Sequence, residues 1–317
     1  GRDPEQFPVC PACKEIYEGM REKWHLHEPA LRRRHVWRGD GESAAHSATM
    51  SCMTIRVNAD NFSRAETDRM FHDLQANAGG VNRFSHARVP ADVENQAVIR
   101  LNRDTLYSFA VVDVRDGATL TLPEAGERYL SAMVVDENHF VDAIFHDAGT
   151  HEIAAPDDSS KYVVVAVRIL VDPADADDIA AVAALQDQLV LTSNSAVPFD
   201  YPDYDNVSFD ETRNALLALA RNLDGFDHMF GTRDEVRPVH HLIGTAAGWG
   251  GLPSSEATYI GVDPRLPLAQ YELTVRDVPV DGFWSISVYN AQGFFEPNAR
   301  GAYTVNDITA VKNEDGS

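Results

Sequence analysis

The sequence has few cysteines, no long apolar run and a shortage of basic residues, and each of these features excludes a class of protein. Its three cysteines, Cys10, Cys13 and Cys52, all lie in the first 52 of 317 residues, so disulfide bonds do not hold the remaining chain together. No apolar run approaches the roughly 18 residues that a membrane-spanning helix needs. No signal peptide is recognisable either, so we expect a soluble, cytoplasmic protein.

Acidic residues outnumber basic ones by 49 to 27, which gives a formal net charge of −22. Such a charge repels nucleic acid and anionic membrane surfaces, so neither is an expected partner. The chain also lacks a Gly-x-Ser-x-Gly elbow, and no Walker or Rossmann glycine pattern follows a strand. Esterase activity of the α/β-hydrolase type and nucleotide-driven chemistry are therefore both disfavoured.

Residues 1–52 differ from the rest of the chain in charge. They hold eight Lys and Arg and eight Asp and Glu, so the whole net charge falls on 53–317. This break in composition indicates an N-terminal extension that is poorly ordered.

The extension contains a candidate zinc site. Cys10-Pro-Ala-Cys13 is followed by His25, His27 and His35, and thiolate and imidazole are the ligands that zinc favours. The alternative is a fortuitous Cys-x-x-Cys in an unstructured leader.

From residue 53 the pattern is first β, then helical, then β again. Ser63-Arg-Ala-Glu66 is a capping box that predicts the start of a helix, ended by Gly79-Gly80, and about six to eight short strands follow up to residue 170. Strands spaced so regularly, with no helices between them, favour an antiparallel sandwich or barrel. We divide the chain into the extension (1–52), a β domain (53–170), a helical linker or cover (171–250) and a second β domain (251–317).

The stretch Val98–Val114 is the centre of the first β domain. Asn102, Arg103 and Asp104 stand between two apolar, β-branched runs, which predicts two core strands that meet at a turn or bulge. An amide, a guanidinium and a carboxylate are costly to bury unpaired. They must therefore bind each other, the backbone or a ligand.

Two long motifs carry a family resemblance. Asn102-Arg-Asp-Thr-Leu-Tyr-Ser108, with Arg128-Tyr129, resembles the bacterial domain of unknown function 1254. Val278–Asn290, continuing through Gly293–Asn298 and Asn306, resembles its usual partner, domain of unknown function 1214.

The resemblance spans about residues 53–317 and implies a mainly β protein, with two antiparallel, jelly-roll-like β-sandwich domains joined by a helical segment. Family members continue past the Asp315-Gly316 turn, so we expect a truncated chain with an unpaired sheet edge. Residues 1–52 have no counterpart known to us.

The first candidate site is Asn102, Asp104 and Tyr107, with Arg103 between them. It could bind a polyol or position a water molecule, with Asp104 as the general base. The alternative is a polar turn network that only satisfies itself.

A second candidate set combines imidazoles and carboxylates: Asp136, His139, Asp142, His146, Asp147 and His151. It offers His139 as a proton carrier or a divalent metal site, although the spacing matches no established metal motif. The alternative is solvated side chains at strand ends.

A third set is Arg237, His240, His241 and the glycine-rich run Gly244–Gly251, whose Trp249 offers a flat face to a sugar or an apolar ring. The alternative is an inter-domain hinge. An aromatic and amide wall could be added by Trp284, Tyr289, Asn290 and Asn306, although core burial is the default for Trp284.

Two functional hypotheses follow. The first is a hydrolase or lyase that acts on a small polar or carbohydrate-like substrate in an inter-domain cleft, with Asp104, His139 or His241 as proton carrier. The second is a non-catalytic module that binds a ligand or self-assembles into a homo-oligomer, since jelly-roll folds host both roles.

Overall fold

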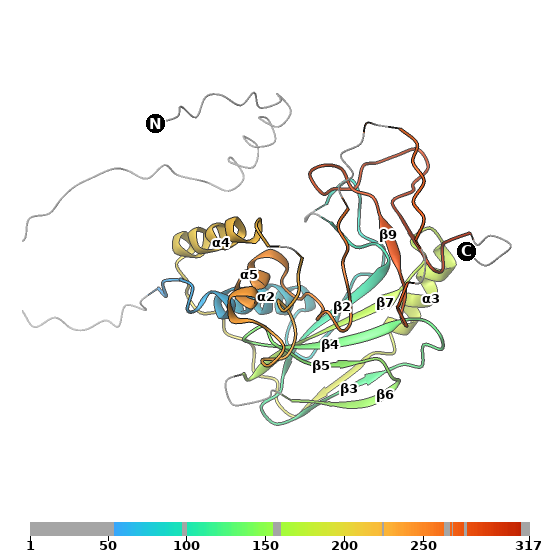
Figure 1. Cartoon of the computed structure of the whole chain (residues 1–317). Helices are drawn as coiled ribbons and strands as arrows, with labels where there is room; N and C mark the ends of the chain where they lie inside the picture. The colour runs from blue at the N-terminus through green and yellow to red at the C-terminus, as the bar shows by residue number, and fades with distance from the viewer. Residues whose placement is uncertain are drawn as a thin grey trace, which may run out of the picture. The chain divides into compact units, whose positions relative to one another are not determined.

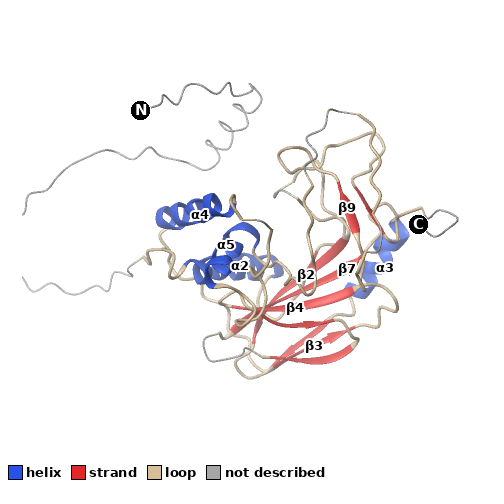
Figure 2. Cartoon of the chain, in the orientation of Figure 1, coloured by secondary structure: helices blue, strands red, loops and turns tan. Residues whose placement is uncertain are grey.

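The computed structural model describes residues 54–96, 100–154, 160–223, 225–262, 267, 269–275 and 278–311, and elements are labelled as in Figure 1. The helices are α2 (Phe62–Ala78), α3 (Ala176–Gln186), α4 (Asn206–Ala220) and α5 (Pro238–Gly248). The strands are β1 (Ser85–His86), β2 (Thr105–Asp113), β3 (Ala118–Leu122), β4 (Leu130–Asp136), β5 (Val141–Phe145), β6 (Gly149–Ile153), β7 (Tyr162–Leu170), β8 (Val190–Ser193), β9 (Ser285–Ser287) and β10 (Thr304–Asn306). The described chain is thus mainly sheet, as predicted, and its strand ladders are antiparallel (Figure 2).

The largest sheet has five strands in the order β1-β2-β7-β4-β5. Its central pair, β2 and β7, stays in register from Thr105 opposite Leu170 to Asp113 opposite Tyr162. Nearly every residue of β7 is buried, because both faces of this strand are covered. That is why its sequence is a continuous apolar run instead of an alternation.

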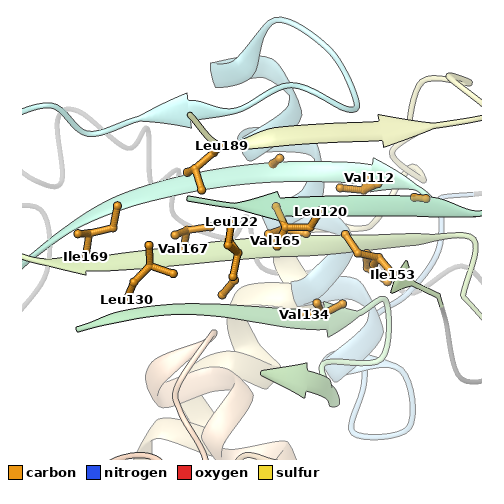
Figure 3. Close-up of a cluster of buried hydrophobic side chains, with 14 of the residues drawn as sticks. Val112, Leu120, Leu122, Leu130, Val134, Ile153, Val165, Val167, Ile169 and Leu189 are labelled. Carbon is orange, nitrogen blue, oxygen red and sulfur yellow. The ribbon is translucent and has the colours of Figure 1, made fainter. Parts of the chain in front are cut away.

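A three-stranded sheet, in the order β6-β3-β8, shares one hydrophobic cluster with the larger sheet. Figure 3 shows Leu120 and Leu122 of β3 among Val165 and Val167 of β7. β8 comes from the predicted helical region, yet it completes this sheet by pairing with β3.

Helices and loops cover the opposite face of the five-stranded sheet. Phe71 of α2, Phe199 and Leu252 join Met133 and Val164 of the sheet in a second cluster. α2, α4 and α5 contact one another, as Figure 2 shows, and bury a third cluster between them. None of the helices in the described ranges has the length and apolar character needed to cross a membrane.

The start of α2 differs from the predicted capping box. The helix begins at Phe62, and the side chain of its N-cap residue, Asn61, accepts no capping hydrogen bond. The Ser63 hydroxyl lies 3.4 Å from Thr245 Oγ1, and Glu66 binds Arg69, so tertiary and side-chain partners take up both groups of the expected box. The predicted stop is confirmed, because Gly79 has the left-handed φ of 71°.

The sequence of 171–250 predicts one helix after the cap Asp172-Pro173 and a second helix over about 210–224, and both exist with shifted starts. Asp175 caps α3 by accepting from the Asp177 amide at 2.9 Å, so this helix begins after the expected Asp172-Pro173 cap. Asp205 caps α4, which starts about four residues before the predicted position. Each helix begins after the aspartate whose side chain accepts from the free amides of the first turn. A periodic apolar pattern does not identify that aspartate.

α5 was not predicted. Pro238 at its first turn is a typical start, but the glycines in the run to Gly251 suggested a hinge. These glycines allow close packing instead. A Cβ on Gly244 would lie 2.7 Å from Met229 Cβ, and one on Gly251 would overlap the Phe230 ring.

The polar stretch Asn102–Asp104 precedes β2 and does not interrupt a strand. Arg100 and Leu101 are not in a strand, and residues 97–99 lie outside the described residues. The Asn102 side chain accepts from the Asp104 amide at 2.7 Å, which closes a local turn in place of a ladder hydrogen bond. Of the two core strands predicted here, the second is β2, while Arg100 and Leu101, the described end of the first, form no strand.

The C-terminal segment has less strand than its alternation predicted. Alternating apolar residues predict strands over 270–278, 282–290 and 303–312, but among the described residues the second is reduced to β9 and the third to β10. These two strands pair with each other. Residues 270–275 form no strand.

Candidate functional site

Asp104 is buried, with 3% exposure, just before the first residue of β2. Its Oδ1 accepts hydrogen bonds from Thr304 Oγ1 at 2.9 Å and Asn306 Nδ2 at 3.0 Å, both on β10. Among the described residues nothing donates to Oδ2 and no cation pairs with this carboxylate. Asp104 therefore holds the C-terminal segment against β2 with one oxygen and leaves the other available.

The Asn102 side chain forms hydrogen bonds with three neighbours in the same motif. Its Nδ2 donates to Thr105 Oγ1 at 3.2 Å and to the Tyr107 hydroxyl at 3.0 Å, while its Oδ1 holds the Asp104 amide. The predicted alternative of a polar turn network therefore describes Asn102 well.

Arg103 points away from that network. Its guanidinium donates to the Ala91 carbonyl, and its Cζ lies 5.4 Å from the centre of the Tyr303 ring. Its Nε is buried and has no hydrogen-bond partner among the described residues. Burial lowers the pKa of this guanidinium, against the opposing charges of Asp92 and Asp104.

A polar row crosses the helix-covered face of the five-stranded sheet beside this motif. Tyr107 on β2 lies opposite Arg168 on β7, and Arg168 lies opposite Ser131 on β4. The adjacent row on the same face is apolar, with Ala166 between Phe109 and Met133. The row was not recognised from the sequence, because only the register of the strands brings its members together.

The Arg168 guanidinium occupies the middle of this row. Its Nη2 donates to the Gly250 carbonyl at 2.9 Å, and its Cζ lies 5.5 Å from the centre of the Tyr107 ring. Its Nη1 is buried and lacks a hydrogen-bond partner among the described residues. Buried donors of this kind are rare, since each one forfeits its hydration.

Tyr129 flanks the row at its β4 end. Its hydroxyl donates to Ser131 Oγ at 3.0 Å. Burial raises the pKa of this phenol, while the Ser131 hydrogen bond and the Arg168 charge oppose the rise. The Tyr129 ring packs edge-on against Phe283, at 5.1 Å between ring centres.

Further contacts hold the C-terminal segment close to this region. His146 Nε2 lies 2.9 Å from Glu256 Oε2, and the Tyr289 hydroxyl donates to the Leu101 carbonyl at 3.1 Å. The row is therefore bounded by the sheet on one side and by the segment after α5 on the other.

His139, a predicted proton carrier, is 2% exposed at the turn after β4. Its Nε2 accepts from the Gly250 amide at 2.9 Å, so its Nδ1 carries the proton and donates to Thr245 Oγ1 at 2.8 Å. Burial and the neighbouring His241 hold its pKa well below the ordinary value for histidine. Both ring nitrogens are used internally, and this geometry favours a structural role.

His241 stacks on His139, at 5.4 Å between ring centres. Both of its nitrogens face carbonyl oxygens, Nδ1 that of Met229 at 3.3 Å and Nε2 that of Asn138 at 3.0 Å. A neutral imidazole donates to only one of them. Burial lowers the His241 pKa although both carbonyls favour the cation.

Gly250 connects the histidine pair with the polar row. Its amide donates to His139 and its carbonyl accepts from Arg168. The preceding Trp249 packs its ring against His139, 5.4 Å between centres, and donates from Nε1 to Thr67 Oγ1 at 3.0 Å. That face of the indole is therefore covered by protein and not open to a sugar.

The remaining predicted residues lie apart from the row. Asn290 closes its own loop, accepting from the Phe294 amide at 2.9 Å and donating to Glu296 at 2.5 Å. Trp284 is partly exposed, and its carbonyl accepts from the Asp307 amide. Asn306 is fully buried and binds Asp104.

Metal binding finds no support in the described ranges, where no group of three or more His, Cys, Asp or Glu side chains is arranged to hold an ion. In the second predicted set, Asp136 accepts from the Asn138 and Phe140 amides at 2.8 Å each and so shapes a turn. The zinc candidates Cys10, Cys13, His25 and His27 lie outside the described residues.

The sequence reasoning missed a cluster of buried charges on α2 and the turn after β4. Arg64 donates to Asp68 at 2.8 Å and to Glu137 at 2.5 Å, and Asp68 accepts from the Tyr204 hydroxyl at 2.7 Å. The cluster lines a cavity of about 290 Å³ together with Lys161 and residues 197–200 and 202. The sequence shows only the i, i+4 spacing of Arg64 and Asp68, which is compatible with an ion pair on a helix.

Burial raises the pKa of both carboxyl groups in this cluster. For Asp68 the Arg64 charge and the Tyr204 hydrogen bond oppose the rise. For Glu137 the Lys161 amide opposes it first, followed by Arg64. Because each carboxylate oxygen has a protein partner, the cluster acts as a structural junction.

Comparison with known families finds three matches. A family model described as a protein of unknown function, DUF1254, matches residues 81–193, and a second one, DUF1214, matches residues 266–317. A third, DUF3039, matches residues 1–20.

Solved structures that match this chain include the following two. The VPA0106 protein from Vibrio parahaemolyticus is 18% identical, with a TM-score of 0.60 over 81% of this chain and 84% of that one. An uncharacterised protein from Burkholderia cenocepacia is 13% identical, with a TM-score of 0.35 over 81% and 74%. No curated protein matches. The first structure supports the fold and assigns no chemistry.

Proposed function

Because the chain pairs a DUF1254 domain with a DUF1214 domain, neither of which has an assigned activity, we propose a function from its site: a hydrolase or lyase acting on a small polar or carbohydrate-like substrate. The substrate binds at the polar row of Tyr107, Arg168 and Ser131, beneath the segment that follows α5. We also propose that the two sheets sharing the Leu120 cluster form a jelly-roll-like β-sandwich that carries this site.

The observation that carries the proposal is the row itself. A tyrosine, an arginine and a serine replace apolar side chains across three adjacent strands, directly beside an apolar row. Burying a polar side chain on a covered sheet face costs free energy unless the side chain has hydrogen-bond partners. Functional sites are where such a loss of stability is most often found in proteins.

Asp104 is the proton carrier in this proposal. Its Oδ1 is fixed by Thr304 and Asn306, which orients the carboxylate, and its Oδ2 has no donor among the described residues. An oriented carboxylate with one free oxygen suits general base catalysis. Asn102 connects it to the row, since it binds both the Asp104 amide and the Tyr107 hydroxyl.

The test is Asp104→Asn, assayed with a panel of nitrophenyl glycosides, nitrophenyl esters and uronate-containing disaccharides. The amide oxygen of asparagine still accepts from Thr304 and Asn306, so the fold and the C-terminal contact should persist. The nitrogen that replaces Oδ2 accepts no proton, so kcat should fall by about 10²–10⁴-fold on any substrate that the wild type turns over.

Asp147→Asn, at an exposed position, is the matched control and should retain full activity. A folded Asp104→Asn variant whose kcat stays within twofold of the wild type would remove Asp104 from the mechanism. Absence of turnover by the wild type on every class of the panel would count against an enzyme.

A second candidate function, self-assembly without catalysis, is favoured by apolar side chains in the C-terminal segment. Ile260, Val262, Leu273, Val288 and Val311 are 68–97% exposed. Exposed apolar side chains gathered in one segment are a feature of interaction surfaces. Sedimentation of the wild type and of Val288→Lys tests this: a concentration-dependent oligomer that the lysine weakens supports assembly, and a monomer at all concentrations contradicts it.

A further inference from the structure

We propose that the ligand of the polar row bears a carboxylate group, and that the Arg168 guanidinium binds it through Nη1. This inference rests on the site proposed above and names the chemical class of its ligand. It applies to a substrate and to a non-catalytic ligand alike.

The first argument is that Arg168, unlike many other arginines, forms no ion pair with a carboxylate of the described residues. Six arginines in the described residues form ion pairs with carboxylates: Arg64, Arg69, Arg88, Arg115, Arg128 and Arg213. Arg168 lies on a covered sheet face and has no such pair among the described residues. In a chain with 49 acidic residues, an inward-facing arginine without a carboxylate leaves its counter-charge to another molecule.

The second argument is the geometry of the guanidinium fork. The Nη2 is occupied, because it donates to the Gly250 carbonyl at 2.9 Å. The Nη1 is shielded from solvent and has no acceptor in the described chain. Oxyanions such as carboxylates are strong acceptors for a guanidinium, so one carboxylate oxygen on Nη1 would satisfy the unpaired donor.

The third argument is that the residues beside Arg168 in the row carry hydroxyl groups. Tyr107 and Ser131 are the register neighbours of Arg168, one on each side. The Tyr129 phenol is close enough for the Arg168 charge to oppose the burial that raises its pKa. No carboxylate belongs to the row itself, so within the row an incoming anion meets hydroxyl groups and a cation, while the Glu256 charge acts on Tyr129 from outside the row.

The net charge of −22 does not argue against an anionic ligand here. At physiological salt, exposed charges are screened beyond about 8 Å, while buried pairs are screened much less. The local cation therefore outweighs distant surface acids, and added salt should weaken this buried interaction only slightly.

The test measures binding of two matched pairs of probes, benzoate with benzamide and glucuronate with glucuronamide, by NMR titration of the full chain. In at least one pair the carboxylate should bind about tenfold or more tightly than its amide, with shifts at Gly250, Tyr107 and Arg168. Arg168→Gln should abolish this preference. Arg168→Lys keeps the charge without the fork and should retain part of it.

Arg221→Gln, which removes an exposed arginine at the end of α4, is the control and should keep the full preference. Equal binding of acid and amide in both pairs, or no saturable binding of either carboxylate, would overturn the inference. Equal affinity of wild type and Arg168→Lys or Arg168→Gln for the bound carboxylate would also overturn it. Binding without turnover would sink the enzyme proposal and leave this inference standing.

Discussion

Burial lowers the pKa of both His139 and His241, and this couples the stability of the fold to pH. In an unfolded chain the pKa of a histidine is about 6.5. As the pH falls below that value, the unfolded state takes up protons that the folded state does not bind. The stabilisation from the two neutral rings is therefore complete above pH about 6.5 and is lost as the pH falls.

His139→Asn is predicted to reduce this pH dependence. Asparagine tolerates the left-handed φ of 67° at this position and can still donate to Thr245. The wild type should lose up to about 1.4 kcal/mol per pH unit from this ring below pH 6.5. Urea unfolding of wild type and variant measures the slopes, and equal slopes would show that His139 titrates normally in the fold.

At the scale of elements, close packing decides the course of α5 and the loop after it. Gly244 and Gly251 lie against Met229 and Phe230 so tightly that neither has room for a Cβ. This close packing places the rings of His241 and Trp249 against His139. The same glycines suggested a hinge in the sequence because a pattern does not distinguish a flexible backbone from a crowded one.

Gly251→Ala is predicted to destabilise the protein by about 1–3 kcal/mol, since the added methyl group overlaps the Phe230 ring. Gly248→Ala is the matched control, because its Cβ would lie an ordinary 3.7 Å from Phe230 Cζ. That variant should change little or gain up to about 1 kcal/mol. Denaturant midpoints compare the two, and an equal effect at both positions would refute the packing argument.

At the scale of the whole described body, the Arg64 cluster joins α2 to the sheet. Arg64 and Asp68 belong to the helix, Glu137 to the turn after β4, and Tyr204 to the loop before α4. Removing the shared cation leaves two carboxylates that are 1% and 3% exposed without their ion pair. An unpaired buried charge is far more costly than a missing pair.

Arg64→Met is predicted to lower the free energy of unfolding by roughly 2–3 kcal/mol at pH 7, less than a fully buried pair would lose because Arg64 is 37% exposed. The raised pKa values of Asp68 and Glu137 make their protonated forms accessible. The loss should therefore shrink as the pH falls toward the ordinary carboxyl range near 4. Thermal unfolding at several pH values checks this, and a loss independent of pH would contradict it.

Local patterns alone determined a substantial part of this protein. The valine-rich run of β7, the glycine stop of α2, the helices near 176 and 210, and the motif around Asn102 are all visible in the sequence, since each depends on neighbours a few residues away. The family resemblance came from the same motifs and was confirmed by the family models.

Only the tertiary structure decided which of these residues meet. The contact of Asp104 with Asn306 spans 202 positions, the Arg168 row depends on the register of three strands, and the His139 ring is satisfied by a glycine 111 residues later. Periodicity indicates which face of an element is buried and does not identify its partner. That choice follows from how distant elements pack, and the candidate site was therefore only partly predictable.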